Sequence, residues 1–378
     1  MLTLNATDLA RQLIGFDTIN PVGNEKQISE FLGGYLEARG FSVRLLPFGN
    51  DRYNLVARKG GRSGKLPICF TGHMDTVPLG AMEWRHDPFA GEISHGRLYG
   101  RGACDMKSGI AAVTSAAIEV GDQLDSGPGV VLIFTGGEET GCEGAHHLVR
   151  DLASVGPVGA LVVAEPTGLK PFGGHKGALW LRGVCHGRTA HGSAPHLGEN
   201  AVYKIARKVT RLEEFNFGNL KDEIFGVPSL NVGTVEGGQN PNSVPDRAAI
   251  SIDIRSLPGQ RHQQIKQQLI TQVGEGIDIE IVSDLPSVWT EPDNFWLKSV
   301  ERIAGEVQGL HFESASAPYF TDASVLTPFF GGVPTVILGP GEISVAHKTD
   351  EYCEIRQIEQ AVEIYRAIIS SWTGKSPE

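Results

Sequence analysis

The stretch LIFTGGEETG, from Leu132 to Gly141, joins an apolar run to a glycine pair and then to two adjacent glutamates, Glu138 and Glu139. A short apolar run that ends in turn residues is typical of a strand buried in a parallel or mixed sheet. Neighbouring side chains leave a strand on opposite faces and leave a helix about 100° apart, so adjacent carboxylates cannot easily share one task. The stretch therefore predicts a buried strand whose end carries two acids, of which either one is idle or each has its own partner. The alternative is a solvated helix N-terminus, where the helix dipole favours acids.

Similar apolar runs recur along the chain and predict further strands of the same sheet. They are PICFTG (67–72), ALVVAEP (160–166) and PTVILGPG (334–341), and the small-residue stretch 106–120 suits a helix between two of them. Strand-like segments also occupy 41–46 and 54–59. The region from Thr7 to Gly40 fits two amphipathic helices around a glycine and proline turn. These elements predict an α/β fold with a parallel or mixed sheet.

The middle of the chain has a different pattern. The strands expected at 229–238 and 248–257 alternate apolar and polar residues, as antiparallel sheets with one open face do, and helical segments lie between and after them. The pattern of the first sheet resumes near Phe295. We therefore expect a first domain formed by residues 1–176 and 287–378, interrupted by an inserted α+β domain at 177–286.

Length, charge and cysteine usage restrict the functional class. A chain of 378 residues suggests roughly two domains, and a net charge of −11 without a basic cluster argues against a nucleic-acid partner. The N-terminal sequence does not resemble a signal peptide, and no apolar run approaches the ~18 residues of a membrane span, so we expect a cytoplasmic protein without a membrane partner. Five scattered cysteines without a CxxC pair make a thiolate metal site improbable. A metal would need His, Asp and Glu ligands.

Acids and histidines follow the expected strands in order. His73 and Asp75 lie in CFTGHMDTVP, Asp105 lies in a glycine-rich turn before a helix, and Glu165 and His347 follow two later strands. In α/β sheets, ligands collect at the carboxyl ends of strands, so these groups and the glutamate pair can converge on one crevice. Histidine nitrogens with carboxylate oxygens favour one or two divalent cations, either zinc or its relatives cobalt and manganese.

These ordered motifs resemble the di-zinc metallohydrolases that include aminoacylases, acetylornithine deacetylases, succinyl-diaminopimelate desuccinylases and related carboxypeptidases. The resemblance covers nearly the whole chain. It implies a mixed-sheet zinc-hydrolase catalytic domain with an inserted, ferredoxin-like lid and dimerisation domain, and two divalent ions, zinc or cobalt. Carried over residue by residue, it implies these metal ligands: His73, Asp105, Glu139, Glu165 and His347. Asp75 would orient His73, Asp105 would bridge the two ions, and Glu138 would be the general base for the attacking water.

The inserted segment carries further motifs of the same family. TAHGSAPHLGENA matches a lid motif whose histidine, here His191, would reach the active site of the partner subunit in a homodimer. NSVP and DIRSLPG imply that Asn242 and Arg255 hold the substrate carboxylate. The sequences of these motifs are closest to those of the acetylornithine deacetylase group. This resemblance implies hydrolysis of a small N-acyl amino acid in arginine biosynthesis.

Two positions depart from the family pattern, and other functions remain open. Cys104 precedes the expected bridging Asp105, where a small or hydroxyl residue is usual, and Asp322 stands where the acetylornithine pattern has a glutamate. A carboxypeptidase, a dipeptidase or a succinyl-diaminopimelate desuccinylase could use the same scaffold. A non-catalytic metal-binding assembly protein is the alternative from another class, although such a protein would need no general base.

Overall fold

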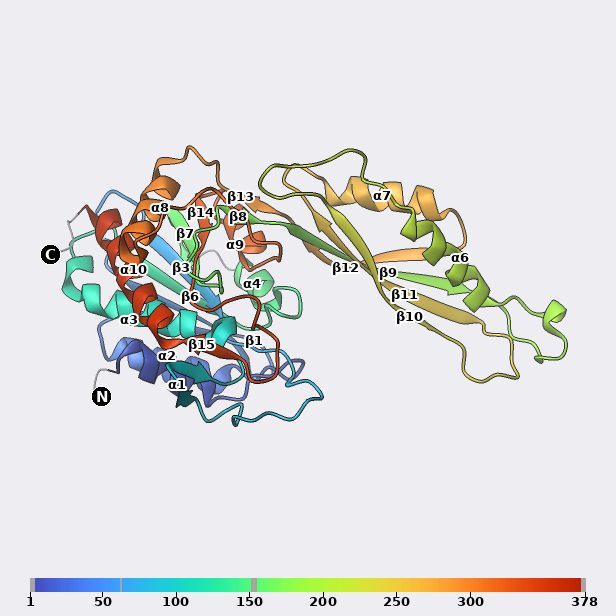
Figure 1. The fold of residues 1–378 in the computed structure, drawn as a ribbon, viewed down its shortest axis with the longest axis horizontal. Helices are drawn as coiled ribbons and strands as arrows, with labels where there is room; N and C mark the ends of the chain where they lie inside the picture. The colour runs from blue at the N-terminus through green and yellow to red at the C-terminus, as the bar shows by residue number, and fades with distance from the viewer. Residues whose placement is uncertain (1–3, 62, 151–154, 375–378) are drawn as a thin grey trace. The chain divides into compact units, whose positions relative to one another are not determined.

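A computed structural model describes residues 4–61, 63–150 and 155–374, and these residues divide into two compact units (Figure 1). The first unit contains the residues up to Gly174, the segment Trp289–Ala317 and the residues from Thr321 onward, and the second contains His175–Val288 and Pro318–Phe320. The sequence analysis assigns Pro318–Phe320 to the catalytic domain, whereas in the structure this segment belongs to the second unit. Within the second unit, the Phe320 ring packs edge-on against Trp180 with a centroid distance of 5.5 Å.

The first unit begins with the two helices expected before Gly40. They are α1, Ala6–Ile14, and α2, Lys26–Glu37. Asn5 caps α1 by accepting the backbone N–H of Asp8 at 2.8 Å. Both helices bury one apolar stripe, which includes Leu9 and Leu13 in α1 and Leu32 in α2.

The centre of this unit is a six-stranded mixed sheet, which confirms the fold class. Its order is β1 (Ser42–Gly49), β2 (Arg52–Lys59), β6 (Val130–Thr135), β3 (Ile68–His73), β7 (Ala160–Val163) and β14 (Thr335–Ile337). The last four strands run parallel to one another, and β1 and β2 pair antiparallel at one edge. Because four parallel neighbours end at the same edge of the sheet, the loops that follow them meet there.

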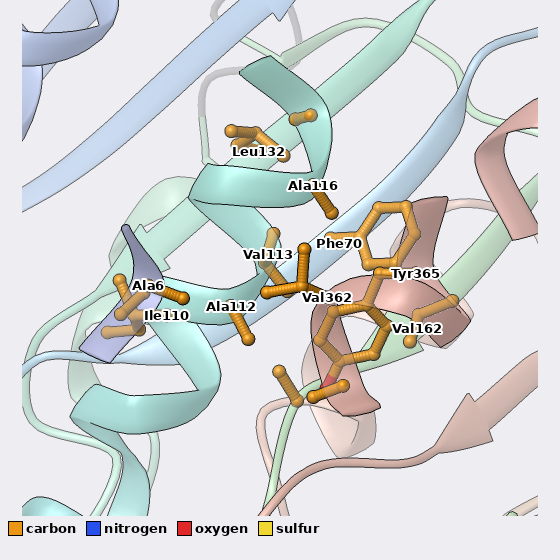
Figure 2. Packing of buried hydrophobic residues seen from close by; sticks show 14 of the residues in the cluster. Ala6, Phe70, Ile110, Ala112, Val113, Ala116, Leu132, Val162, Val362 and Tyr365 are labelled. Carbon is orange, nitrogen blue, oxygen red and sulfur yellow. The ribbon is translucent and has the colours of Figure 1, made fainter. Parts of the chain in front are cut away.

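Helices cover both faces of the sheet, which explains the continuous apolar character of its strands. Ile68 and Phe70 face α3 (Ser108–Val120) and α10 (Ile355–Thr373), whereas the alternate residue Cys69 faces the opposite side. Figure 2 shows the Phe70 ring beside Tyr365 of α10, at a centroid distance of 5.5 Å. On the opposite face, α4 (Glu143–Leu148) contacts β2, and α9 (Ala323–Phe329) contacts β7.

The remaining elements of this unit lie at its periphery. Helix α8 (Phe295–Gln308) packs against α10. A small three-stranded sheet has the order β15 (Tyr352–Glu354), β5 (Arg97–Tyr99) and β4 (Glu92–Ser94). This small sheet holds the chain near residue 352 beside the chain near residue 99, shortly before Asp105.

The second unit has a ferredoxin-like fold, as expected for the inserted segment. Its elements in chain order are β9 (Gly177–His186), α6 (Ala201–Glu213), β10 (Ser229–Gly237), β11 (Arg247–Ser256), α7 (His262–Val273) and β12 (Asp278–Leu285). The strands form an antiparallel sheet in the order β10-β11-β9-β12, and α6 and α7 bury their apolar residues against it. Two short strands, β8 (Gly174–His175) and β13 (Val288–Trp289), pair with each other, and each contains one residue of either unit.

Within the described part of the chain, no helix combines the length and the apolar character that crossing a bilayer requires.

Candidate metal centre

Three of the expected ligands follow neighbouring parallel strands. His73 is the last residue of β3, Glu139 lies in the turn after β6, and Glu165 lies two residues beyond β7. The strands β6, β3 and β7 are adjacent in the sheet. The order of the strands therefore brings these side chains to one edge, as their positions in the sequence predict.

The other two expected ligands reach the same edge from loops. Asp105 lies in an irregular turn, Ala103–Lys107, that leads into α3. His347 lies in the long connection between β14 and β15 and has a positive φ of 62°. Both imidazoles contact the carboxylate of Asp105: His73 Nε2 lies 3.0 Å from Oδ1, and His347 Nε2 lies 3.1 Å from Oδ2.

The five side chains thus form two donor sets that share Asp105. His73 Nε2 is also 3.6 Å from Glu165 Oε1, and His347 Nε2 is also 2.8 Å from Glu139 Oε1. Ligand atoms of His73, Asp105 and Glu139 lie within 4.8 Å of one another. Imidazole nitrogens and carboxylate oxygens at this spacing suit a divalent cation such as zinc. The residues present therefore fit a metal site.

The electrostatics of these residues also favour positive charge. Hydrogen bonds to the Asp105 and Glu139 carboxylates raise the pKa of His347 to about 10, despite partial burial. Burial alone would raise the pKa of Asp105, but its bonds with His347 and His73 hold it well below its usual range. Carboxylates that favour a proton on each neighbouring imidazole equally favour a cation between them.

Glu138 is buried, with only 5% of its surface exposed, whereas Glu139 is partly exposed. Burial is the main cause that raises the pKa of the Glu138 carboxyl well above its ordinary value, and the nearby Glu165 and Glu139 carboxylates raise it further. One Glu138 oxygen lies within 4.8 Å of ligand atoms of His73 and Glu165. The alternative of a solvated helix N-terminus is therefore wrong for Glu138. Its carboxylate lies beside the donor sets in a setting that favours proton uptake.

Asp75 contacts both His73 and the turn after β6 that carries Gly136, Gly137, Glu138 and Glu139, here called the glutamate turn. The His73 ring, through Nδ1, lies 3.0 Å from the Asp75 carbonyl oxygen and 3.6 Å from its Oδ1. The Asp75 carboxylate accepts the backbone N–H of Glu138 at 3.1 Å and of Glu139 at 3.2 Å. Asn20 donates a further hydrogen bond to Oδ2 at 2.7 Å. Asp75 therefore contacts the backbone of the glutamate pair through its carboxylate and the imidazole chiefly through its carbonyl, and its orienting role stays a prediction.

Sequence reasoning missed the residues that hold the Asp105 turn. Glu351 accepts the backbone N–H groups of Cys104 and Asp105, each at 2.9 Å, and forms a buried ion pair with Arg101. The sequence signal that could have identified Glu351 is its position shortly after His347, within the family-like stretch LGPGEISVAHKTDEY. A carboxylate in that stretch can support the ligand turn without touching a metal.

The two departures from the family pattern also lie near the centre. Cys104 is buried, and its thiol donates to the Glu342 carbonyl oxygen at 3.3 Å. Asp322 is buried and accepts a hydrogen bond from the hydroxyl of Thr135, the last residue of β6. Burial raises the pKa of Asp322 to about 6, although the Thr135 bond opposes this.

The three remaining predicted site residues lie in the second unit. His191 is exposed, and its Nδ1 lies 2.8 Å from the Ser193 hydroxyl. The neighbouring Gly192 donates its N–H to the Asn242 carbonyl oxygen at 2.7 Å, so the His191 and Asn242 loops lie side by side.

Arg255 lies on β11 and donates from Nε to Asp253 Oδ2 at 3.1 Å. Its guanidinium lies 5.5 Å from the centre of the Phe320 ring. The roles of Arg255, His191 and Asn242 toward a substrate stay predictions.

Comparisons with known proteins place the chain in a family. Residues 69–371 match the profile of the peptidase family M20/M25/M40. An acetylornithine deacetylase of Myxococcus xanthus is 32% identical over 386 residues, which cover 96% of each chain. A probable succinyl-diaminopimelate desuccinylase of Staphylococcus epidermidis is 28% identical over an alignment 412 residues long. The alignment covers 99% of this chain and 100% of that protein.

A similar fold is found among solved structures. The M20 family metallo-carboxypeptidase Sso-CP2 of Sulfolobus solfataricus has a TM-score of 0.82 at 19% identity, over 98% of this chain and all of that one. The family resemblance inferred from the motifs is confirmed, because the matched profile spans most of the chain, including every ligand-bearing strand end. The chain belongs to the peptidase family M20/M25/M40.

Proposed function

We propose that this chain is a metal-dependent amidohydrolase that removes the acyl group from an N-acyl amino acid, with N-acetylornithine as the favoured substrate. The observation that carries the proposal is the shared carboxylate of Asp105, which lies between the two histidines while Glu138 is buried beside them. The names of relatives at about 30% identity support an amide substrate of this kind. Such an activity would serve arginine biosynthesis.

The cofactor would be two divalent cations, zinc or alternatively cobalt. His73 and Glu165 would hold one ion, His347 and Glu139 the other, and Asp105 both. When bound, such ions lower the pKa of a water molecule toward neutrality and polarise a substrate carbonyl.

The side chains of this protein would perform the proton transfers and the positioning. Glu138 would accept a proton from the attacking water and later give it to the departing amine. His191, delivered by the second subunit of a homodimer, would stabilise charge on the carbonyl oxygen, a contribution commonly about 10² to 10³ in rate. Arg255 would offer its planar guanidinium to the substrate carboxylate, assisted by Asn242.

The test is a substrate panel on protein stripped of metal and reconstituted with zinc or with cobalt. We expect N-acetyl amino acids, N-acetylornithine foremost, to be hydrolysed faster than dipeptides, and we expect a chelator to abolish the activity. Faster hydrolysis of dipeptides would identify a peptidase instead. Metal-loaded protein that is inactive on the whole panel would favour the non-catalytic assembly protein.

Desuccinylation is the second candidate activity, because the desuccinylase relative from Staphylococcus epidermidis spans nearly the whole chain. The panel therefore includes N-succinyl amino acids beside the acetyl compounds, with the same amine component in each pair. A preference for succinyl over acetyl substrates would reassign the acyl group while leaving the hydrolytic chemistry unchanged.

A further inference from the structure

The glutamate turn rests on a buried ion pair that has no place in the donor sets. Glu25, just before α2, is fully buried, and Arg52, at the start of β2, has 12% of its side chain exposed. Arg52 Nε lies 2.8 Å from Glu25 Oε2 and 3.1 Å from Oε1. Both residues belong to the first unit, and their hydrogen bonds and ion pairs go to residues other than the five predicted ligands. A buried ion pair needs exact partners to offset the loss of hydration, so its geometry is restricted.

The ion pair contacts the backbone of the turn directly. A Cβ atom on Gly136 would lie 2.6 Å from Glu25 Cδ, and a Cβ atom on Gly137 would lie 2.8 Å from Arg52 Nη2. Gly137 also has a positive φ of 70°. The two glycines before Glu138 therefore allow the chain to pass against the charged groups at a distance that a larger residue could not reach.

A second route leads from the same arginine to the same turn. Arg52 Nη2 lies 3.5 Å from Asn20 Oδ1, and Asn20 Nδ2 donates to Asp75 Oδ2 at 2.7 Å. The Asp75 carboxylate in turn accepts the backbone N–H groups of Glu138 and Glu139. The ion pair thus reaches the turn both by packing under its glycines and through a chain of hydrogen bonds to its amides.

We propose that the Glu25–Arg52 ion pair fixes the backbone of the glutamate turn, so that Glu138 is held in position for proton transfer and Glu139 for metal binding. Arg52 and Glu25 are positioning residues, which act through Asn20, Asp75 and the glycine pair. The catalytic part of this inference rests on the proposed function, whereas the fixing of the turn does not. The competing explanation is an ion pair that only stabilises the fold.

The test compares Arg52→Met, Glu25→Gln and the double variant with wild type. Loss of one charge leaves the opposite charge buried and unpaired and destabilises the fold, whereas loss of both charges relieves that penalty. We therefore expect the double variant to recover stability toward wild type. If Arg52 positions the turn, kcat of both Arg52→Met and the double variant should be about 10- to 100-fold below wild type, with little change in KM.

Hydrogen exchange on metal-free protein gives a readout that needs no activity. The amides of Glu138 and Glu139 should exchange at least about 10-fold faster in Arg52→Met and in the double variant, while the amides of β6 stay protected. Arg58→Met is the matched control, because Arg58 lies on the same strand and donates to the Val155 carbonyl oxygen. This control should leave both the turn amides and kcat unchanged.

Each outcome decides the proposal. Recovery of kcat together with stability in the double variant, or unchanged exchange at the turn, would overturn it. If Arg52→Met does not fold, the double variant supplies the same comparison. If wild type hydrolyses no N-acyl amino acid, the proposed function fails, and the exchange measurement alone decides whether the ion pair fixes the turn.

Discussion

Asp105 is the residue that joins the two donor sets of the candidate metal centre, because each of its carboxylate oxygens faces a different histidine. The two adjacent glutamates likewise lie beside different histidines. Glu139 contacts His347, whereas Glu138 is buried against the His73 and Glu165 set. Adjacency in the sequence therefore gives the two carboxylates different surroundings and, we propose, different tasks.

The first prediction separates these tasks by two isosteric changes. Glu138→Gln should leave the metal content intact and lower kcat by at least about 10², because it removes the proton acceptor. Glu139→Gln should lower the metal content toward one ion per chain, because a charged donor becomes neutral. Metal analysis of the purified variants, together with kcat, checks both. Equal loss of metal from the two variants would contradict the division.

A second prediction at this scale concerns stability in acid. Burial, aided by Arg255, lowers the pKa of His175 to about 4, while backbone hydrogen bonds oppose the shift. Between that value and the unfolded value of about 6.5, the unfolded chain takes up a proton that the folded chain does not. This group should therefore cost the fold about 3 kcal/mol as the pH falls from 6.5 to 4.

Urea unfolding of wild type and His175→Asn across this range measures the effect. The variant should lose that part of the pH dependence, even if its stability at pH 7 is lower. His196→Asn, which alters an exposed histidine of the same unit, is the control and should keep the wild-type slope. An unaltered slope in His175→Asn would refute the assignment.

At the scale of elements, α3 approaches the end of β7 more closely than a side chain would allow. A Cβ atom on Gly109 of α3 would overlap the carbonyl oxygen of Ala164, the residue before Glu165. Gly109→Ala should therefore destabilise the fold by about 1–3 kcal/mol and displace the loop that carries Glu165. Gly34→Ala in α2 is the matched control, because its Cβ atom would meet nothing within 4 Å. That control should be neutral or stabilising by up to about 1 kcal/mol in urea unfolding.

The elements and the strand ends could be predicted from the sequence because their signals are local. The apolar run before Gly136 and the acids after each strand are visible without a structure. The supports of the site could not be predicted in this way. Glu351 holds the Asp105 turn, and Arg52 lies under the Gly137 backbone, across long separations in the chain. Such contacts depend on tertiary packing, for which neither spacing nor periodicity gives a signal.

At the scale of the whole molecule, the predicted site residues are divided between two units. The five predicted ligands and Glu138 lie in the first unit, and His191 lies in the second. If His191 serves the partner subunit, a mixture of Glu138→Gln and His191→Ala chains should recover activity, because each heterodimer contains one intact site. Random exchange of equal amounts should give about a quarter of the wild-type activity. Activity assays after co-refolding check this, and the absence of recovery would place His191 in its own subunit or in no catalytic role.

The distance along the chain between His73 and His347 has a consequence for biosynthesis. Synthesis proceeds from the N-terminus, and the second unit is made between the β3 and β14 strands of the first. Until β14 and the His347 loop emerge from the ribosome, the nascent chain offers only part of the donor set. The inserted unit, whose own strands and helices are contiguous, can fold earlier. The full set of predicted ligands is therefore present only after His347 has been synthesised. Chains that end before His347 should be released without a fully formed metal site.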